Sequence, residues 1–167
     1  MVKKEIKKYG QFFTSMETAR FMAGLYNIPA DMKKVRILDA GAGSGILSCA
    51  FIERLETLDS VQEIEVTCYE NDSNVLNLLE NNLEYCRANA NKKITLKIIT
   101  DNYILSQYLD FNRMIGGNAN PKKYDFVIGN PPYMKISKDA PEATAMPEVC
   151  YGAPNLYFLF ASMGLFN

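Results

Sequence analysis

The 167-residue sequence contains no histidine. Histidine is the side chain that most often serves as a general base near neutral pH, and it is a common metal ligand. Without it, any chemistry must depend on a cofactor, carboxylates, amides or aromatic rings. None of the four cysteines, Cys49, Cys68, Cys86 and Cys150, belongs to a CxxC pair. We therefore expect free thiols, with no metal site and no disulfide framework.

Long apolar runs are absent as well. No stretch approaches the roughly 20 residues that a membrane-spanning helix needs, and the charged first eight residues lead into no signal-like segment. We expect a cytoplasmic protein with no membrane partner. The net charge is −1, and the one visible basic cluster is Lys3, Lys4, Lys7 and Lys8. Nucleic-acid-binding proteins usually present a basic face, so charge argues mildly against this chain holding DNA by itself.

Hydrophobic patterning predicts strands that alternate with helices. Strands are predicted at 35–40, 64–70, 94–100 and 124–129, and helices at 17–26, 46–58, 73–89 and 155–166. Ser15 is expected to cap the first helix, whose inward side chains are predicted to be Ala19, Phe21, Met22, Leu25 and Tyr26. The segment 137–154 contains three prolines and is predicted to be a mobile loop. Alternating strands and helices favour an α/β fold with a parallel sheet.

A glycine-rich turn follows the first predicted strand. Residues 38–45 read LDAGAGSG and open a helix. Glycines such as Gly41 and Gly43 allow positive φ and let a ligand approach the backbone closely. Glu70 ends the next strand and should face the same crevice, where a carboxylate suits the two hydroxyls of a ribose. The alternative is a generic strand-to-helix turn with a surface acid.

The charge of this turn discriminates between two cofactors. A dinucleotide site would have the spacing G-x-G-x-x-G, whereas this turn reads G-x-G-x-G after Asp39. A fixed negative charge would repel a pyrophosphate but attract the ammonium of a methionine moiety, which favours S-adenosylmethionine. Asp101 ends the third predicted strand and could accept from the amine of the cofactor's adenine. A helix or turn cap is an equally open interpretation of Asp101.

The sequence Asn130-Pro131-Pro132-Tyr133 follows the fourth predicted strand. The exocyclic amine of adenine is a poor nucleophile because its lone pair is delocalised into the ring. Acceptors aimed at its hydrogens, the Asn130 side-chain oxygen and the Pro131 carbonyl, would favour a tetrahedral nitrogen. Tyr133 offers a flat face for a base taken out of the duplex. The alternative is a proline-rich turn whose tyrosine packs on the sheet.

Together these motifs resemble the amino-type DNA methyltransferases of the gamma arrangement, in particular the adenine-specific enzymes of restriction-modification systems. The resemblance spans nearly the whole chain and implies a Rossmann-like S-adenosylmethionine-dependent methyltransferase sheet with strand order 3-2-1-4. It assigns Asn130, Pro131, Pro132 and Tyr133 to catalysis, and Thr14, Asp39, Gly41, Gly43, Glu70, Asp101, Asn102 and Phe160 to the cofactor. Thr14 belongs to the motif Gly10–Thr14. Ser15 stands where the family usually has proline, and Asn102 where it often has a hydrophobic residue, so Tyr103 would take the packing role.

The implied activity is site-specific transfer of a methyl group from S-adenosylmethionine to the exocyclic amine of a flipped-out adenine in double-stranded DNA. The family continues with further strands and a target-recognition domain, so we expect residues 1–167 to be one truncated domain. Its fourth strand would then be an edge through which copies self-associate.

Several enzyme classes share these residues. The same tetrapeptide occurs in methyltransferases that act on a protein glutamine amide or on a guanine of ribosomal RNA. The amine of cytosine could be activated in the same way. The motif Gly10–Thr14, joined almost directly to the sheet, favours the DNA enzymes because it leaves no room for a helical substrate domain. A non-catalytic cofactor-binding fragment is also compatible with the sequence.

Overall fold

The computed structural model describes residues 14–117 and 123–167. These residues group into two compact units. The sheet unit contains 14–100 and 124–130, and the helical unit contains 101–117, 123 and 131–167. The predicted basic cluster and residues 10–13 of the first motif lie outside the described residues.

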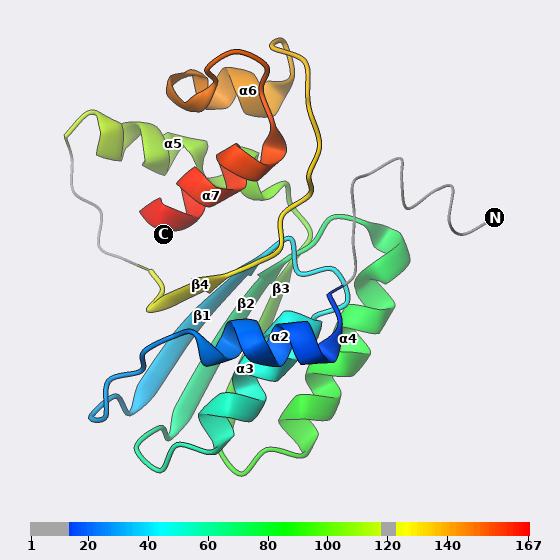
Figure 1. The fold of residues 1–167 in the computed structure, drawn as a ribbon, viewed down its shortest axis with the longest axis vertical. Helices are drawn as coiled ribbons and strands as arrows, with labels where there is room; N and C mark the ends of the chain where they lie inside the picture. The colour runs from blue at the N-terminus through cyan, green and yellow to red at the C-terminus, as the bar shows by residue number, and fades with distance from the viewer. Residues whose placement is uncertain (1–13, 118–122) are drawn as a thin grey trace. The chain divides into compact units, whose positions relative to one another are not determined.

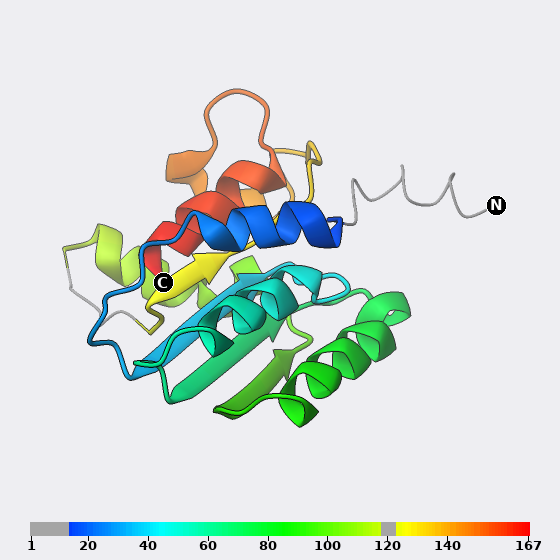
Figure 2. The ribbon, with the colours of Figure 1, turned by 60° about the horizontal axis from the view of Figure 1, so that its bottom comes forward.

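The sheet unit is built on four parallel strands. They are β1 (Lys34–Ala40), β2 (Glu63–Tyr69), β3 (Lys93–Ile99) and β4 (Phe126–Ile128), and their order is β3-β2-β1-β4. The arrowheads of all four strands point the same way (Figure 2). The predicted fold class and strand order 3-2-1-4 are confirmed. β4 has three residues where the sequence predicted six.

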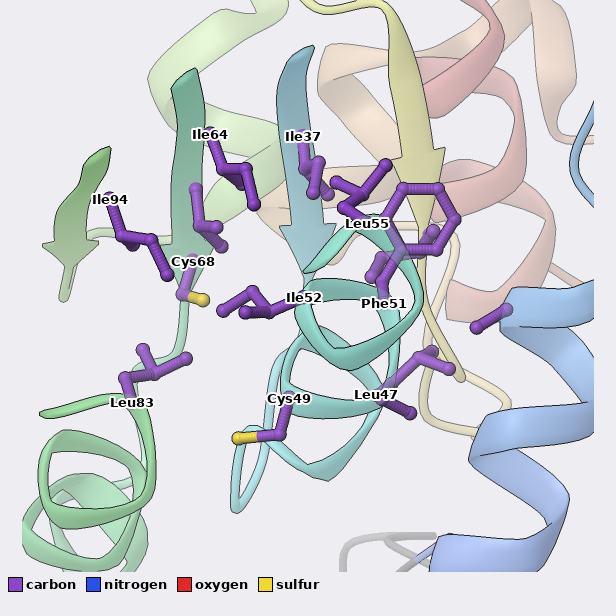
Figure 3. Close-up of a cluster of buried hydrophobic side chains, with 14 of the residues drawn as sticks. Ile37, Leu47, Cys49, Phe51, Ile52, Leu55, Ile64, Cys68, Leu83 and Ile94 are labelled. Atoms are coloured by element: carbon purple, nitrogen blue, oxygen red, sulfur yellow. The ribbon is translucent and has the colours of Figure 1, made fainter. Parts of the chain in front are cut away.

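Three helices belong to the same unit: α2 (Met16–Gly24), α3 (Ile46–Glu56) and α4 (Ser73–Ala88) (Figure 1). α3 packs on β2, α4 packs on β3, and α2 packs on α3. Figure 3 shows the resulting core, in which Phe51 and Leu55 of α3 meet Ile37 of β1. Leu83 of α4 lies on the far side of the same cluster. Burial of these side chains supplies the main driving force for this layer.

The inward face of α2 differs from the prediction. Ser15 caps the helix as expected, since its side chain accepts from the Thr18 backbone N–H. However, Phe21 is 68% exposed and Leu25 is 69% exposed, while Ala19 and Ala23 are buried. Of the five residues predicted to face inward, Ala19 is buried and Met22 and Tyr26 pack against the core, whereas Phe21 and Leu25 do not. Small alanines let the backbone of α2 approach α3 closely, and the prediction is wrong for Phe21 and Leu25 alone.

The helical unit comprises α5 (Tyr103–Ile115), α6 (Pro141–Ala145), the 3₁₀ helix η1 (Pro147–Val149) and α7 (Leu156–Phe166). α7 was predicted, whereas α5 was not. The expectation of a loop through 137–154 is wrong in part, because α6 and η1 lie there. Pro141 and Pro147 stand at the first positions of these two helices. Proline suits that position because its fixed φ fits a helix and its missing N–H would have no intrahelical partner.

None of the helices described at 14–117 and 123–167 has the length and apolarity that a membrane span requires.

A close backbone approach joins β4 to β1. A Cβ built on Gly129 would lie 2.9 Å from the carbonyl oxygen of Ala40. Real Cβ atoms essentially never come that near to an oxygen, and neither backbone can move without disturbing the strand pairing. Gly129 therefore allows the carboxyl end of β4 to run beside the end of β1.

We predict that Gly129→Ala destabilises the chain by about 1–3 kcal/mol, the usual cost of overpacking. Urea unfolding followed by circular dichroism measures this difference. Gly24→Ala is the matched control, because its Cβ would meet nothing within 4 Å and alanine favours a helix. Equal stability of the two variants would show that the β4 backbone can shift freely.

Candidate cofactor and catalytic site

The glycine turn after β1 is held against the end of β2. Gly41, Gly43 and Gly45 have φ values of 73°, 54° and 77°, a region that residues with a Cβ rarely adopt. The carbonyl oxygen of Tyr69 accepts from the backbone N–H of both Gly41 and Ala42, each at 2.9 Å. The turn is therefore fixed at the carboxyl edge of the sheet.

Glu70 fastens the next part of this turn. One carboxylate oxygen accepts from the Gly43 N–H at 2.8 Å, and the other accepts from the Asp72 N–H at 2.8 Å. Glu70 is only 6% exposed. Each carboxylate oxygen has two acceptor positions, so these bonds leave the capacity to accept from a ribose hydroxyl. The structure thus brings together Glu70 and Gly43, as the sequence predicted.

Asp39 occupies a different environment. It is 1% exposed, and its carboxylate accepts from the Ser48 hydroxyl at 2.6 Å. Burial raises the pKa of Asp39 to about 6, the Ser48 hydrogen bonds oppose this rise, and the charge of Glu70 adds to it. Asp39 thus ties the end of β1 to the first turn of α3.

Asn82 of α4 holds the turn from a third side. Its side-chain amide donates to the Ser44 carbonyl oxygen at 2.8 Å. This contact was not predicted from the sequence. The sequence feature that could have indicated this contact is the amide of Asn82, which stands between the inward-facing Leu79 and Leu83 where an apolar side chain would be expected. Leu79 also approaches the turn, since a Cβ on Gly45 would lie 2.7 Å from its methyl carbon.

Asn130 and Thr14 meet within the sheet unit. The side-chain amide nitrogen of Asn130 donates to the Thr14 hydroxyl at 3.4 Å. This contact joins residues 116 positions apart, one from the motif that precedes α2 and one from the segment after β4. With its nitrogen directed at Thr14, the atom of Asn130 that would accept from an amine is the carbonyl oxygen.

In the helical unit, Tyr133 stacks on Tyr157. Their ring centroids are 5.1 Å apart and the rings are inclined by 17°. Backbone pairing sets this contact, because the Leu156 N–H donates to the Met134 carbonyl and the Ile136 N–H donates to the Pro154 carbonyl. Tyr133 remains 56% exposed. Tyr157 lies in a helix that the sequence predicted, but its contact with the tetrapeptide was not predicted.

The other expected site residues of the helical unit lie as follows. Asn102 caps α5 by accepting from the Leu105 N–H, and it donates to Glu142 at 2.7 Å. Asp101 is exposed and stands directly before this cap.

The ring of Phe160 packs on that of Tyr103 at 5.2 Å. The carbonyl of Pro132 accepts from the Met134 N–H, and Pro131 is half-buried.

Register places the main site residues of the sheet unit along one edge. Asp39 of β1 pairs with Cys68 of β2 and Ile128 of β4. Glu70 and Asn130 therefore follow the ends of two strands that flank the glycine turn. In parallel α/β sheets this carboxyl edge is where ligands bind. In the described ranges, no group of three or more potential metal ligands occurs.

The sequence matches the Eco57I restriction-modification methylase family over residues 31–166. It is 33% identical over 162 residues to the type II methyltransferase M.PstI of Providencia stuartii, covering 95% of this chain and 30% of that protein. It is 34% identical over 119 residues to a release factor glutamine methyltransferase of Fusobacterium nucleatum, covering 71% and 27%. The chain thus spans about 30% of the length of such relatives.

Among solved structures, the fold resembles a type I restriction-modification methyltransferase subunit from Streptococcus thermophilus. The TM-score is 0.61 at 20% identity, covering 93% of this chain and 31% of that one. This likeness agrees with the parallel sheet and strand order of the sheet unit. The family match spans β1 to α7, and on that basis the chain belongs to the Eco57I restriction-modification methylase family.

Proposed function

We propose that this chain is the cofactor-binding and catalytic part of a DNA methyltransferase that modifies the exocyclic amine of adenine within a restriction-modification system. The observation that carries the proposal is the shared edge of the sheet unit. There, Glu70 holds the glycine turn while Asn130 follows the neighbouring strand end. The similarity to the type II methyltransferase M.PstI, at 33% identity, supports the methyltransferase part of this assignment.

The glycine turn fits S-adenosylmethionine. A Cβ built on Gly43 would meet nothing within 4 Å, so space beside this backbone is open to a ligand. Glu70 stands next to that space and suits the ribose hydroxyls. Asp39 supplies a negative charge for the methionine ammonium, and Thr14 a hydroxyl for the methionine part. When bound, the cofactor supplies an electrophilic methyl group on a sulfonium.

Asn130 would act on the target amine. Its side-chain oxygen accepts one amine hydrogen, and the Pro131 carbonyl is proposed to accept the other. These two hydrogen bonds draw the nitrogen lone pair out of conjugation with the ring, so it can attack the methyl group. No protein nucleophile is needed, because positioning and electrostatics carry the step.

Tyr133 would stack on the flipped base. One face of its ring is already covered by Tyr157, so the base would take the opposite face. Such a stack holds Tyr133 in one orientation and reduces the rotamer freedom that is lost on binding. We propose that Asp101, Asn102 and Phe160 contribute to the pocket for the cofactor's adenine.

Methylation of a protein glutamine amide is the second candidate. The similarity to a release factor glutamine methyltransferase, 34% over 119 residues, favours a glutamine amide over a guanine of ribosomal RNA as the second substrate to test. Asn130 would activate an amide nitrogen by the same hydrogen bonds, so the nature of the methylated product separates the DNA enzyme from the glutamine enzyme.

We predict that the chain binds S-adenosylmethionine and that Glu70→Ala weakens binding roughly 10-fold to 100-fold, the range for losing a hydrogen bond to a charged group. Isothermal titration of S-adenosylmethionine and of its demethylated product measures this. Glu63→Ala is the matched control, because Glu63 begins β2, the strand that Glu70 follows, and it pairs with surface lysines. Equal weakening in both variants, or binding of NAD instead, would refute the cofactor assignment.

We predict that Asn130→Ala lowers methyl transfer to DNA by about 100-fold, as when one preorganised polar group is removed from a transition state. Cofactor affinity should change little. Radiolabelled methyl incorporation into unmethylated DNA, followed by nucleoside chromatography, measures the rate and identifies N6-methyladenine. Asn91→Ala is the control, since Asn91 is exposed. Methylated cytosine, or transfer to a glutamine peptide and none to DNA, would contradict the adenine assignment.

The charge of Asp39 carries a stability cost. An exposed aspartate loses its proton near pH 4, whereas Asp39 in the folded chain holds its proton up to about pH 6. The folded state therefore loses stability as pH rises from about 4 through about 6, and the loss is complete above that range. A bound ammonium would offset this cost, which is a functional reason for the charge.

We predict that Asp39→Asn stabilises the cofactor-free chain by about 3 kcal/mol at pH 8 and by about half as much at pH 5. Asparagine still accepts from Ser48, so the structural link persists. Urea unfolding at the two pH values measures the gain.

Asp125→Asn is the control of opposite sign. Burial would raise the pKa of Asp125, but the hydrogen bonds and charge of Arg36 outweigh it and lower that pKa. Its neutralisation should therefore reduce stability at pH 8. A gain for Asp39→Asn that does not depend on pH would contradict the electrostatic account.

A further inference from the structure

Two cysteines of the sheet unit face each other across the α3–α4 packing. Cys49 lies on α3 and Cys86 on α4, the two helices pack against each other, and each thiol shifts the pKa of the other. The Cys49 sulfur also lies 3.6 Å from the Asn82 carbonyl oxygen, one helical turn before Cys86. Figure 3 shows the Cys49 sulfur directed from α3 toward the side on which Leu83 of α4 lies.

The two thiols differ in exposure and acidity. Cys49 is 4% exposed, whereas Cys86 is only partly buried. The hydrogen bond from Cys49 lowers the pKa of the Cys86 thiol, against the opposing effects of burial and of Glu53. The same hydrogen bond and burial raise the pKa of Cys49. An accessible, more acidic thiol beside a buried one is the arrangement of an attacking and a resolving cysteine.

The other two cysteines have different surroundings. Cys68 is fully buried and its sulfur lies 3.5 Å from the Ser48 hydroxyl. Cys150 belongs to the helical unit and donates to the Ala143 carbonyl at 3.7 Å. They serve as internal references for reactivity.

We propose that Cys49 and Cys86 form a thiol–disulfide site that small disulfides such as oxidised glutathione convert reversibly into an intramolecular disulfide. This site is separate from the proposed methyl-transfer chemistry and does not depend on it. Because Asn82 holds the glycine turn through Ser44, the new bond would tie α3 to α4 beside that turn.

The reaction balances in two exchanges. The Cys86 thiolate attacks one sulfur of oxidised glutathione, which forms a Cys86–glutathione mixed disulfide and releases one glutathione thiolate. Cys49 then gives its proton to the released glutathione thiolate, and the Cys49 thiolate attacks the Cys86 sulfur and displaces the second glutathione as a thiolate, which takes up the proton that Cys86 lost. Two protein thiols are oxidised to one disulfide, and one glutathione disulfide is reduced to two thiols.

The test treats the folded chain with oxidised glutathione and measures intact mass, free thiols and disulfide-linked peptides by mass spectrometry. The four free thiols should fall to two, with Cys49 and Cys86 linked, and dithiothreitol should restore them. The melting temperature without reductant should rise, because the bond restricts the unfolded chain. In urea the preference for this pairing should disappear, since contacts between the helices are then lost.

Single substitutions separate the two roles. Cys49→Ser should accumulate the mixed disulfide on Cys86, because the resolving thiol is gone. Cys86→Ser should leave Cys49 unmodified, and Cys150→Ser should behave as wild type. Equal glutathione adducts on Cys86 and Cys150 of the wild type, with no 49–86 link, would overturn the proposal. The mass readout involves no methyl donor, so its failure is distinct from a failure of the proposed function.

Discussion

The carboxylate of Glu70 is the interaction on which the candidate site depends. It accepts from the backbone of the glycine turn with one oxygen and from the start of the α4 region with the other. A single buried side chain thereby joins the segment after β1 to the segment after β2. Hydrogen bonds to a charged acceptor are among the stronger ones in proteins. The glycine turn keeps its positive φ values because the Tyr69 carbonyl and the Glu70 carboxylate both accept from its backbone N–H groups.

Asp39, the second buried carboxylate, has different partners. Asp39 receives its hydrogen bonds from Ser48, and burial dominates its pKa. An asparagine could accept from Ser48 in the same way without this cost, yet an acid occupies the position. Residues that lower stability without an evident structural gain often mark functional sites. Glu70 thus shapes the turn, and the role proposed for Asp39 is to supply negative charge to the methionine ammonium.

Much of the sheet unit could be predicted because its signals are local. Strands such as β2 and β3 are rich in β-branched residues, and the glycine turn follows directly from residues 41–45. Contacts that depend on packing could not be predicted. The burial of Ala19 and Ala23, with Phe21 and Leu25 exposed, depends on how closely α2 approaches α3. Asn82 and Tyr157 act on segments more than twenty residues away, which no periodic pattern reveals.

Less of the helical unit could be predicted from the sequence. Asn102 is the N-cap that precedes α5, and that residue was assigned to a ligand even though asparagine is a strong helix cap. The prolines of 137–154 suggested a loop, whereas two of them open short helices. The roles assigned to residues of this unit therefore stay predictions, while α5 and the two short helices around them were not predicted.

The strand order also has a consequence for how the chain folds during synthesis. β1 pairs with β2 through residues about 30 positions apart, but its other partner, β4, pairs Leu38 with Val127, 89 positions later. Such distant pairing is entropically costly and forms slowly. While the ribosome makes α4, β3 and α5, one side of β1 has no strand beside it. Until Phe126–Ile128 leaves the ribosome, this edge of β1 is unpaired and open to pairing with another chain.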